Sequence, residues 1–374
     1  EEPSVVEARS ALEAARHAGA AIVASPHEWT TRVQGQRRDY RDRSASSGEW
    51  SAQLERALRV NGKSALDRQL GEVEQEIARA RLGEARHEAA RALADLWLDV
   101  IAARGQRVLL ESQLAFAEAN LAAVDKRRRA GDASVLDLNI ARADQGEIRR
   151  QASLAATQLA KAQAKLRVRF PKAAPTAAEL SAPVAVAWPQ QQWRERVLSE
   201  ADPLKTAEGQ RRKAELTAAR TRADRIPDPT IGVYTATEAV RNERVVGISL
   251  SIPLAGTYRE QRMLQAVRDS DTARAALERS RQQIEVEAAE AWAEAEGSLE
   301  RWRVAEQAAG LAGDSARLMQ RAYELGEADL QALLLARRQS AEAARAALEA
   351  RTDALRWRHR LLIDAHWTWN LAED

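Results

Sequence analysis

Apolar residues recur at helical spacing over two long stretches of the chain. In each stretch the helical pattern stops once, at a glycine, and restarts directly after it. The first stretch, residues 64–168, reverses near Gly131, and the second, residues 258–369, reverses near Gly326. Neither contains a proline. At about 1.5 Å per residue, the first arm of some sixty residues is roughly 100 Å long. The pattern therefore predicts two long helical hairpins, each with a tight turn at its tip.

The two hairpins are copies of one unit. A shift of 195 positions places Gly131 on Gly326 without a gap, and the flanking residues follow in register: Val135 on Leu330, Leu138 on Leu333, Ala141 on Ala336, Arg142 on Arg337, Trp97 on Trp292 and Leu166 on Leu361. A repeat of this size predicts a duplicated fold. We expect a first repeat at residues 1–170, a proline-rich linker at 171–200 and a second repeat at 201–374.

Each copy opens with a shorter helix and two strand-like runs. The helices are expected at residues 4–24 and 203–226, and the strands at about 29–40, 50–60, 230–237 and 244–254. In the run 50–60 apolar residues alternate with polar ones, with Arg56 as the exception, which predicts a strand with one wet face. The run VVGISLSIPL, residues 245–254, has the clearest strand pattern of the four. The run 29–40 is far more polar, and we interpret it as a strand mainly because its partner looks like one.

Composition favours long helices over a sheet-rich globule, since 30% of residues are charged and only 4% are aromatic. The net charge of +2 spreads over interspersed charges of both signs, which is typical of solvated helix faces and argues against nucleic acid as a partner. There is no cysteine, and the motifs HExxH, GxSxG and the phosphate loop are missing. The five histidines lack ligand spacing. We expect no enzyme activity, no catalytic residue, no cofactor and no metal ligand.

No window approaches the roughly 20 apolar residues of a membrane-spanning helix. The chain opens on Glu1-Glu2-Pro3 without a visible signal peptide, as a mature or trimmed protein would. Contact with a bilayer would therefore use strands or a lipid anchor. Two strands per repeat give a four-stranded sheet with open edges, which closure removes. Three chains would supply twelve strands for one barrel above a ring of long helices.

The sequence resembles the TolC-type outer membrane efflux proteins along nearly its whole length. Four segments carry the resemblance: the two tips, Arg129–Leu138 and Tyr323–Leu333, and the two runs of the second strand pair, Pro227–Val233 and Gly247–Leu254. The amino-acid sequence of the strand runs is most similar to the branch that serves heavy-metal pumps of the cobalt–zinc–cadmium type.

The resemblance implies a mainly α protein with a small β part, forming a homotrimer. Its twelve-stranded barrel would lie in the lipid of the outer membrane of a Gram-negative bacterium, and its helical tunnel in the periplasm. The partners implied are a periplasmic adaptor and an inner-membrane pump of the RND type. The adaptor contacts carried over are Gly131, Asp132, Val135, Gly326, Glu327 and Leu330.

The resemblance also suggests where a periplasmic gate lies. Family members often place aspartates six and nine residues after the second tip glycine, but these positions are Ala332 and Leu335 here. Asp137 stands at the first of them in copy one, and Asp329 lies nearer the second turn. Tyr323 matches a tyrosine associated with holding such tips closed. The gate candidates are therefore Asp137, Tyr323 and Asp329, and the second tip is expected to do most of the gating.

Several alternatives stay open on sequence alone. The tip glycines can be plain helix ends, and an acid after each turn is stabilised there in any case. The basic run 126–129 is either a solvated helix end or a docking surface for an acidic patch. A drug-efflux duct of the same family is an alternative to metal export. A soluble coiled-coil scaffold, with the strand-like runs as loops, is an alternative from another class.

Overall fold

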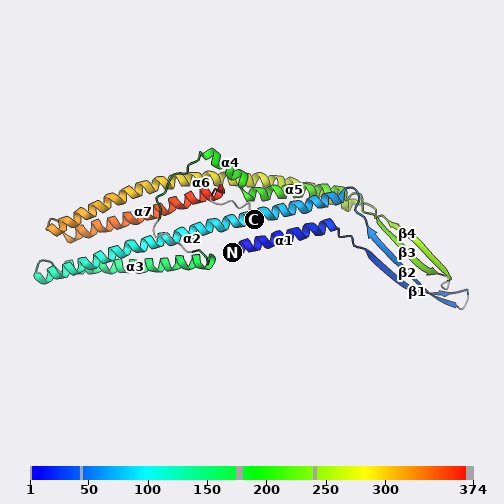
Figure 1. Cartoon of the computed structure of the whole chain (residues 1–374), viewed down its shortest axis with the longest axis horizontal. Coiled ribbons are helices and arrows are strands. Elements are labelled where there is room, and N and C mark those ends of the chain that lie inside the picture. The colour runs from blue at the N-terminus through cyan, green and yellow to red at the C-terminus, as the bar shows by residue number, and fades with distance from the viewer. Residues whose placement is uncertain (1, 43–44, 174–179, 239–241, 368–374) are drawn as a thin grey trace. The chain divides into compact units, whose positions relative to one another are not determined.

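The computed structural model describes residues 2–42, 45–173, 180–238 and 242–367, which form long helices and one small sheet (Figure 1). The elements in chain order are α1 (Pro3–Ala24), β1 (Thr30–Tyr40), β2 (Ala45–Ala57), α2 (Lys63–Ala130), α3 (Val135–Arg169), α4 (Gln190–Glu200), α5 (Asp202–Ala223), β3 (Thr230–Glu238), β4 (Glu243–Ser251), α6 (Thr257–Leu325) and α7 (Leu330–Asp364). The predicted fold class, mainly α with a small β part in a duplicated unit, is confirmed. Among the described residues, no helix is both long and apolar enough to cross a membrane.

The structure departs from the sequence prediction at three elements. β2 begins at Ala45, well before the predicted start, because it pairs with β1 up to the turn between them. β4 ends at Ser251, ahead of Pro253, which lacks the N–H that a strand uses for pairing. The expected linker contains the helix α4. Both VVGISLSIPL and the polar run 29–40 form strands, so the scaffold alternative that treated the strand-like runs as loops is wrong.

The chain divides into two compact units, and each unit contains parts of both repeats. We call residues 1–5, 85–201 and 284–374 the tip unit, and residues 6–84 and 202–283 the sheet unit. The long helices α2 and α6 each run through both units. The two copies of the sequence therefore fold into shared cores rather than into two separate domains.

In the tip unit, two helical hairpins lie with their turns at the same end (Figure 1). Away from the turns, the indole of Trp193 on α4 is buried, donates from Nε1 to the carbonyl oxygen of Leu361 at 2.8 Å and lies 5.6 Å from the Trp292 ring. Arg169, at the end of α3, pairs with Glu2 next to the start of α1 at 3.2 Å. Trp292 is thus a packing anchor, and the expected linker holds α7 against α6.

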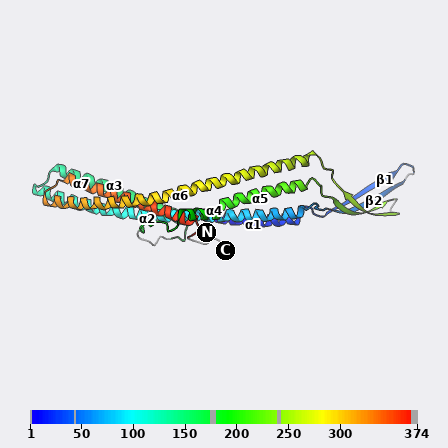
Figure 2. The ribbon, with the colours of Figure 1, turned by 90° about the horizontal axis from the view of Figure 1, so that it is seen from above.

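In the sheet unit, the four strands form one antiparallel sheet in the order β1-β2-β3-β4, beyond the ends of α1 and α5 (Figure 2). The central pair joins the repeats, since Leu54 of β2 lies opposite Val233 of β3. Gly19 of α1 and Gly71 of α2 approach so closely that an added Cβ on Gly71 would lie 2.9 Å from Gly19. The helices α1 and α2 of the first copy therefore pack tightly against each other.

Candidate functional site

Both hairpin tips turn in the same way. Gly131 and Gly326 have φ angles of +90° and +77°, in the left-handed region that glycine adopts at little cost. At the first tip, the N–H of Gly131 donates to the carbonyl oxygen of Arg128, and the N–H of Asp132 donates to the carbonyl oxygen of Arg127. The second tip repeats both bonds, and this pair of bonds defines the Schellman motif. The duplicated glycines therefore serve the same backbone geometry.

The predicted gate acids Asp137 and Asp329 both cap helices. Ser134 caps α3 by accepting from the Asp137 N–H, while the Asp137 carboxylate accepts from the Ser134 N–H at 2.9 Å, which completes a capping box. Asp329 caps α7 by accepting from the Ala332 N–H at 2.7 Å. Each acid thus has a local structural role that explains its presence without a gate.

The Asp137 cap is expected to depend on pH. Hydrogen bonds from the backbone N–H and then the hydroxyl of Ser134 hold the pKa of the Asp137 carboxyl below its ordinary value. The stabilisation is therefore complete above the ordinary carboxyl range and is lost as the pH falls through the lowered value. Asp137→Asn should weaken the first turn of α3 by about 1 kcal/mol at neutral pH. Faster amide hydrogen exchange at residues 134–138 would show this, and exchange unchanged from that of an Asp132→Asn control would contradict it.

The two tips share one apolar cluster. Its buried members come from three helices and are Val124, Leu138, Ala141, Leu330 and Leu334. Tyr323 packs against this cluster, and the Arg127 guanidinium carbon lies 5.3 Å from the centre of its ring. A cation over an aromatic face is attracted by its negative quadrupole. Arg127 of copy one and Tyr323 of copy two therefore join the tips directly.

The predicted adaptor contacts divide into exposed and buried residues. Gly131, Asp132, Gly326 and Glu327 are exposed, and so is Val135. Its repeat equivalent, Leu330, is only 5% exposed and lies within the shared cluster. Sequence reasoning missed two large apolar residues exposed beside the turns, Leu136 and Leu325. Their position next to a predicted turn was the signal in the sequence that could have identified them.

The sheet has one apolar and one polar face, because successive side chains in a strand point to opposite sides. The pairing places on one face Val33, Trp50, Ala52, Leu54, Ile231, Val233, Val246, Ile248 and Leu250. Most of these are exposed, and Ile248 reaches 78%. The opposite face carries Arg32 paired with Glu55, and Arg38 paired with Glu49, which is 5% exposed. The two glutamates are thus better covered than the apolar side chains of the other face, the reverse of a sheet folded against a water-soluble core.

The pairing also accounts for most of the charge on β1. Arg32 and Arg38 lie on the polar face. Arg37 and Asp39 lie on the apolar face, but they sit close to the turn and pair with each other at 2.9 Å. The high charge of the first strand pair is therefore compatible with one continuous apolar face over the middle of the sheet.

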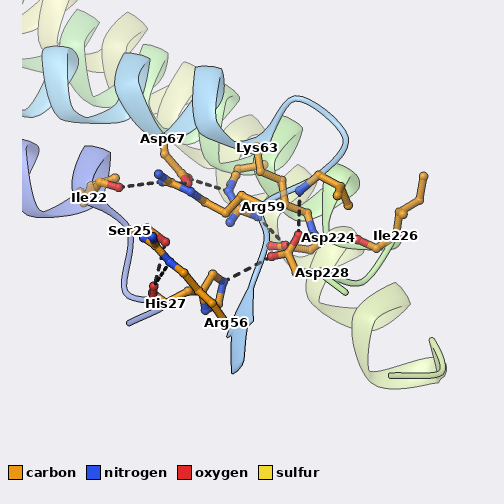
Figure 3. Close-up of polar contacts among 12 residues, drawn as sticks. Ile22, Ser25, His27, Arg56, Arg59, Lys63, Asp67, Asp224, Ile226 and Asp228 are labelled. Carbon is orange, nitrogen blue, oxygen red and sulfur yellow. Dashed lines mark hydrogen bonds and ion pairs between the residues drawn. The ribbon is translucent and has the colours of Figure 1, made fainter. Parts of the chain in front are cut away.

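A buried polar cluster joins the strands to the helices (Figure 3). The side chain of Lys63, at the start of α2, is fully buried and donates to the Ile226 carbonyl oxygen at 2.7 Å and to Asp228 Oδ1 at 2.8 Å. Its ammonium also lies 3.4 Å from Asp224. Asp228 accepts in addition from the Val60 N–H at 3.0 Å. Lys63 from copy one and the loop before β3 from copy two thus fix each other.

The same cluster continues to the end of α1. Arg59 donates to the carbonyl oxygens of Ile22 and Val23 at 2.9 and 2.6 Å and pairs with Asp67 at 2.9 Å. The carbonyl oxygens in the last turn of a helix lack partners within the helix, so Arg59 satisfies two of them. Asp67 also pairs with Arg220 of α5 at 2.6 Å. The cluster therefore connects four elements that belong to both repeats.

The fold is similar to that of several outer-membrane channels. The outer-membrane channel OprN matches with a TM-score of 0.84 at 16% identity, over 98% of this chain and 87% of that one. CusC, studied for transmembrane channel formation, matches at 0.82 and 16%, over 98% and 89%. The open state of the MtrE outer membrane channel of Neisseria gonorrhoeae matches at 0.80 and 17%, over 98% and 86%. No family model matches the sequence, and neither does any curated protein. These similarities establish that the chain has the fold of outer-membrane channels.

Proposed function

We propose that the chain is one subunit of an outer-membrane channel that serves as the exit duct of a tripartite efflux pump. The sheet carries the proposal: its apolar face is exposed over the middle of the sheet, and Arg32, Arg38, Glu49 and Glu55 lie on the other face. Lipid outside and an aqueous lumen inside suit this distribution, because barrel strands alternate between apolar and polar sides. The duct needs no chemistry of its own.

The open edges of the sheet favour a homotrimer. β1 and β4 are the outer strands, and each pairs along only one edge within the chain. An unpaired edge presents a row of free N–H and C=O groups that a membrane cannot solvate. Pairing β4 of one copy with β1 of the next satisfies both edges at once. Three copies then close a twelve-stranded barrel and bring six hairpin tips to each trimer.

The exposed tips suit contact with a periplasmic adaptor, through which the channel would reach an RND-type pump of the inner membrane. Acidic residues stand beside apolar ones there: Asp132 near Val135 and Leu136, and Glu327 near Leu325. Buried apolar anchors with a polar rim are the usual composition of a protein interface. Such a surface would dock a partner that offers apolar side chains and basic groups.

Heavy-metal cations are the proposed cargo. The amino-acid sequence of the second strand pair and the similarity in fold to CusC support this assignment. The folds of OprN and MtrE are about as similar to this chain as that of CusC. Growth of a deletion strain on a panel of metals and drugs tests it. Sensitivity to metal cations alone would support metal export, and sensitivity to drugs alone would favour the drug-efflux alternative.

The channel itself is tested by purification. We expect a trimer that requires detergent and conducts ions when reconstituted in a bilayer. A monomer that stays dispersed in water without detergent would rule the channel out.

The two tip glycines are expected to differ in their importance for export. Valine at either position is strained at positive φ. Gly326→Val should cost more export, because buried Leu330, Leu333 and Leu334 follow that turn, whereas exposed Val135 and Leu136 follow Gly131. Export of the cargo from cells that carry each variant measures this. Gly146→Val, in an open position on α3, is the control, and equal losses for Gly131→Val and Gly326→Val would count against the asymmetry.

A further inference from the structure

Within the tip unit, α7 of the second repeat packs along α2 of the first. The guanidinium carbon of Arg337 on α7 lies 3.8 Å from the centre of the Phe116 ring on α2. Arg356 of α7 pairs with Asp95 of α2 at 3.2 Å. Apolar side chains of both helices also share clusters, with Leu98, Ile101 and Val124 from α2 and Leu334, Leu348 and Leu355 from α7. We call this contact between α2 and α7 the intrachain joint.

The repeat places counterparts of the intrachain joint on α6 and α3. The shift of 195 positions carries α2 onto α6 and α3 onto α7. Leu311 is therefore the counterpart of Phe116, and it is exposed. Arg142 is the counterpart of Arg337, and it is exposed as well. So are the counterparts of the three leucines of α7 named above, which are Asn139, Ser153 and Ala160. The face that is covered on α2 and α7 is thus uncovered on α6 and α3.

The uncovered face of α6 carries a regular apolar row. Its large residues recur every seven positions and are 59%, 63% and 73% exposed, in the order Val304, Leu311 and Leu318. A seven-residue apolar repeat lets one helix pack along another. Glu296 stands where the intrachain joint has Ile101, so this face of α6 is more polar than its counterpart on α2. The row still indicates a partner helix, because none of the described helices of this chain covers it.

The charges on the two uncovered faces are complementary. Lys161 on α3 is the counterpart of Arg356. Glu290 on α6 is the counterpart of Asp95, so both signs are kept although both residue types differ. Lys161 and Glu290 are exposed, and neither forms an ion pair with another described residue. An exposed ion pair stabilises little, so this pair would fix the register of a contact rather than its stability.

We propose that α6 of one chain packs along α3 of a second copy of the chain, in an interchain joint that repeats the intrachain joint. Leu311 then faces the partner's Arg142, and Glu290 pairs with the partner's Lys161. Each chain offers both faces, so the contact runs head to tail and closes into a ring. The interchain joint rests on the proposed homotrimer, and it adds the helices and residues by which the subunits meet outside the sheet.

Cross-linking through introduced cysteines tests the interchain joint, because the chain has no cysteine of its own. The variant with Leu311→Cys and Arg142→Cys is purified in detergent and treated with a short bifunctional maleimide. Most of the protein should run on a denaturing gel as covalent dimers and trimers, in a ladder that ends at three chains. The variant with Phe116→Cys and Arg337→Cys should link within one chain only, since its cysteines lie in the intrachain joint.

The matched control combines Leu311→Cys with Glu147→Cys. Glu147 is also exposed on α3, but it lines a cavity that α3 forms with α2 and α7, so it lies on another face of α3. This control should remain monomeric on the gel. Glu290→Cys with Lys161→Cys reports on the same joint independently, should the first variant fail to fold.

The mass of the untreated protein in detergent separates failure of the interchain joint from failure of the channel. The joint is overturned, and the channel is not, if the protein is a trimer in which neither Leu311→Cys with Arg142→Cys nor Glu290→Cys with Lys161→Cys forms the ladder. A ladder of equal strength from the Glu147→Cys control also overturns the joint. An untreated protein that is monomeric in detergent overturns the homotrimer and the joint together.

Discussion

Val33→Arg is expected to prevent assembly of the channel in the membrane, whereas Gln34→Arg is expected to be tolerated. The two residues are neighbours on β1, and both are exposed in the single chain. Val33 is 71% exposed on the apolar face, opposite Ala52, while Gln34 lies on the polar face. An arginine that faces lipid near the bilayer midplane costs about 2–4 kcal/mol. The cost recurs in every subunit of a symmetric channel.

The measurement is the amount of heat-stable trimer in purified outer membranes, with both variants expressed at equal levels. Val33→Arg should lose most of the trimer, and Gln34→Arg should retain it, because position 34 would face the aqueous lumen. Equal trimer yields for the two variants would show that the faces of β1 are assigned incorrectly. A loss confined to Gln34→Arg would reverse the assignment of lipid and lumen.

The turns and long helices follow from the sequence because their causes are local. A glycine at the end of a proline-free helical pattern, followed by a cap such as Ser134 or Asp329, specifies a Schellman turn within a few residues. The repeat adds a second, independent copy of the same signal. The helical hairpins and their tips were therefore predictable without any knowledge of tertiary contacts.

Features that depend on distant partners were not predictable. The sequence alone did not show which residues of β2 share a face with Val33, because the register between β1 and β2 decides it. Leu330 aligns with exposed Val135, yet it is buried because α7 packs against α2 and α3 at the shared cluster. The prolines around α4 signal a linker, and only the contact of Trp193 with α7 reveals its packing role. Each case was settled by a residue more than a hundred positions away or by a neighbouring strand.

Lys63 is another residue whose importance the sequence does not reveal. A lysine at the start of a charged helix usually extends into water, and here it is fully buried against a loop from the other repeat. Asp228 lies in the run Pro227–Val233, so the contact with Lys63 holds that run in place. It secures the second strand pair to the first long helix.

Lys63→Met is expected to destabilise the protein more than any other single substitution in the polar cluster. Methionine fills a similar volume but leaves Asp228, 14% exposed, without its cation, and removal of one partner from a buried ion pair costs about 3–5 kcal/mol. Thermal unfolding of the detergent-solubilised protein measures the loss. Lys161→Met, at an exposed position on α3, should leave the midpoint unchanged.

The same pair predicts a pH dependence. Burial alone would raise the pKa of the Asp228 carboxyl, but the hydrogen bonds from Lys63 and the Val60 N–H, with the charge of Lys63, hold it below its ordinary value. Stability from this pair is therefore complete above the ordinary carboxyl range and is lost as the pH falls through the lowered value. Lys63→Met should flatten this part of the pH profile of the unfolding midpoint.

A double substitution separates the lost ion pair from lost packing. Asp228→Asn keeps an oxygen that can accept from the Val60 N–H and removes the charge that Lys63→Met leaves unpaired. If the unpaired carboxylate causes the damage, Lys63→Met with Asp228→Asn should be more stable than Lys63→Met alone, because contacting residues are not additive. A double variant that is as unstable as the sum of the two single changes would place the effect in packing. The junction between strands and helices would then be held by shape rather than by charge.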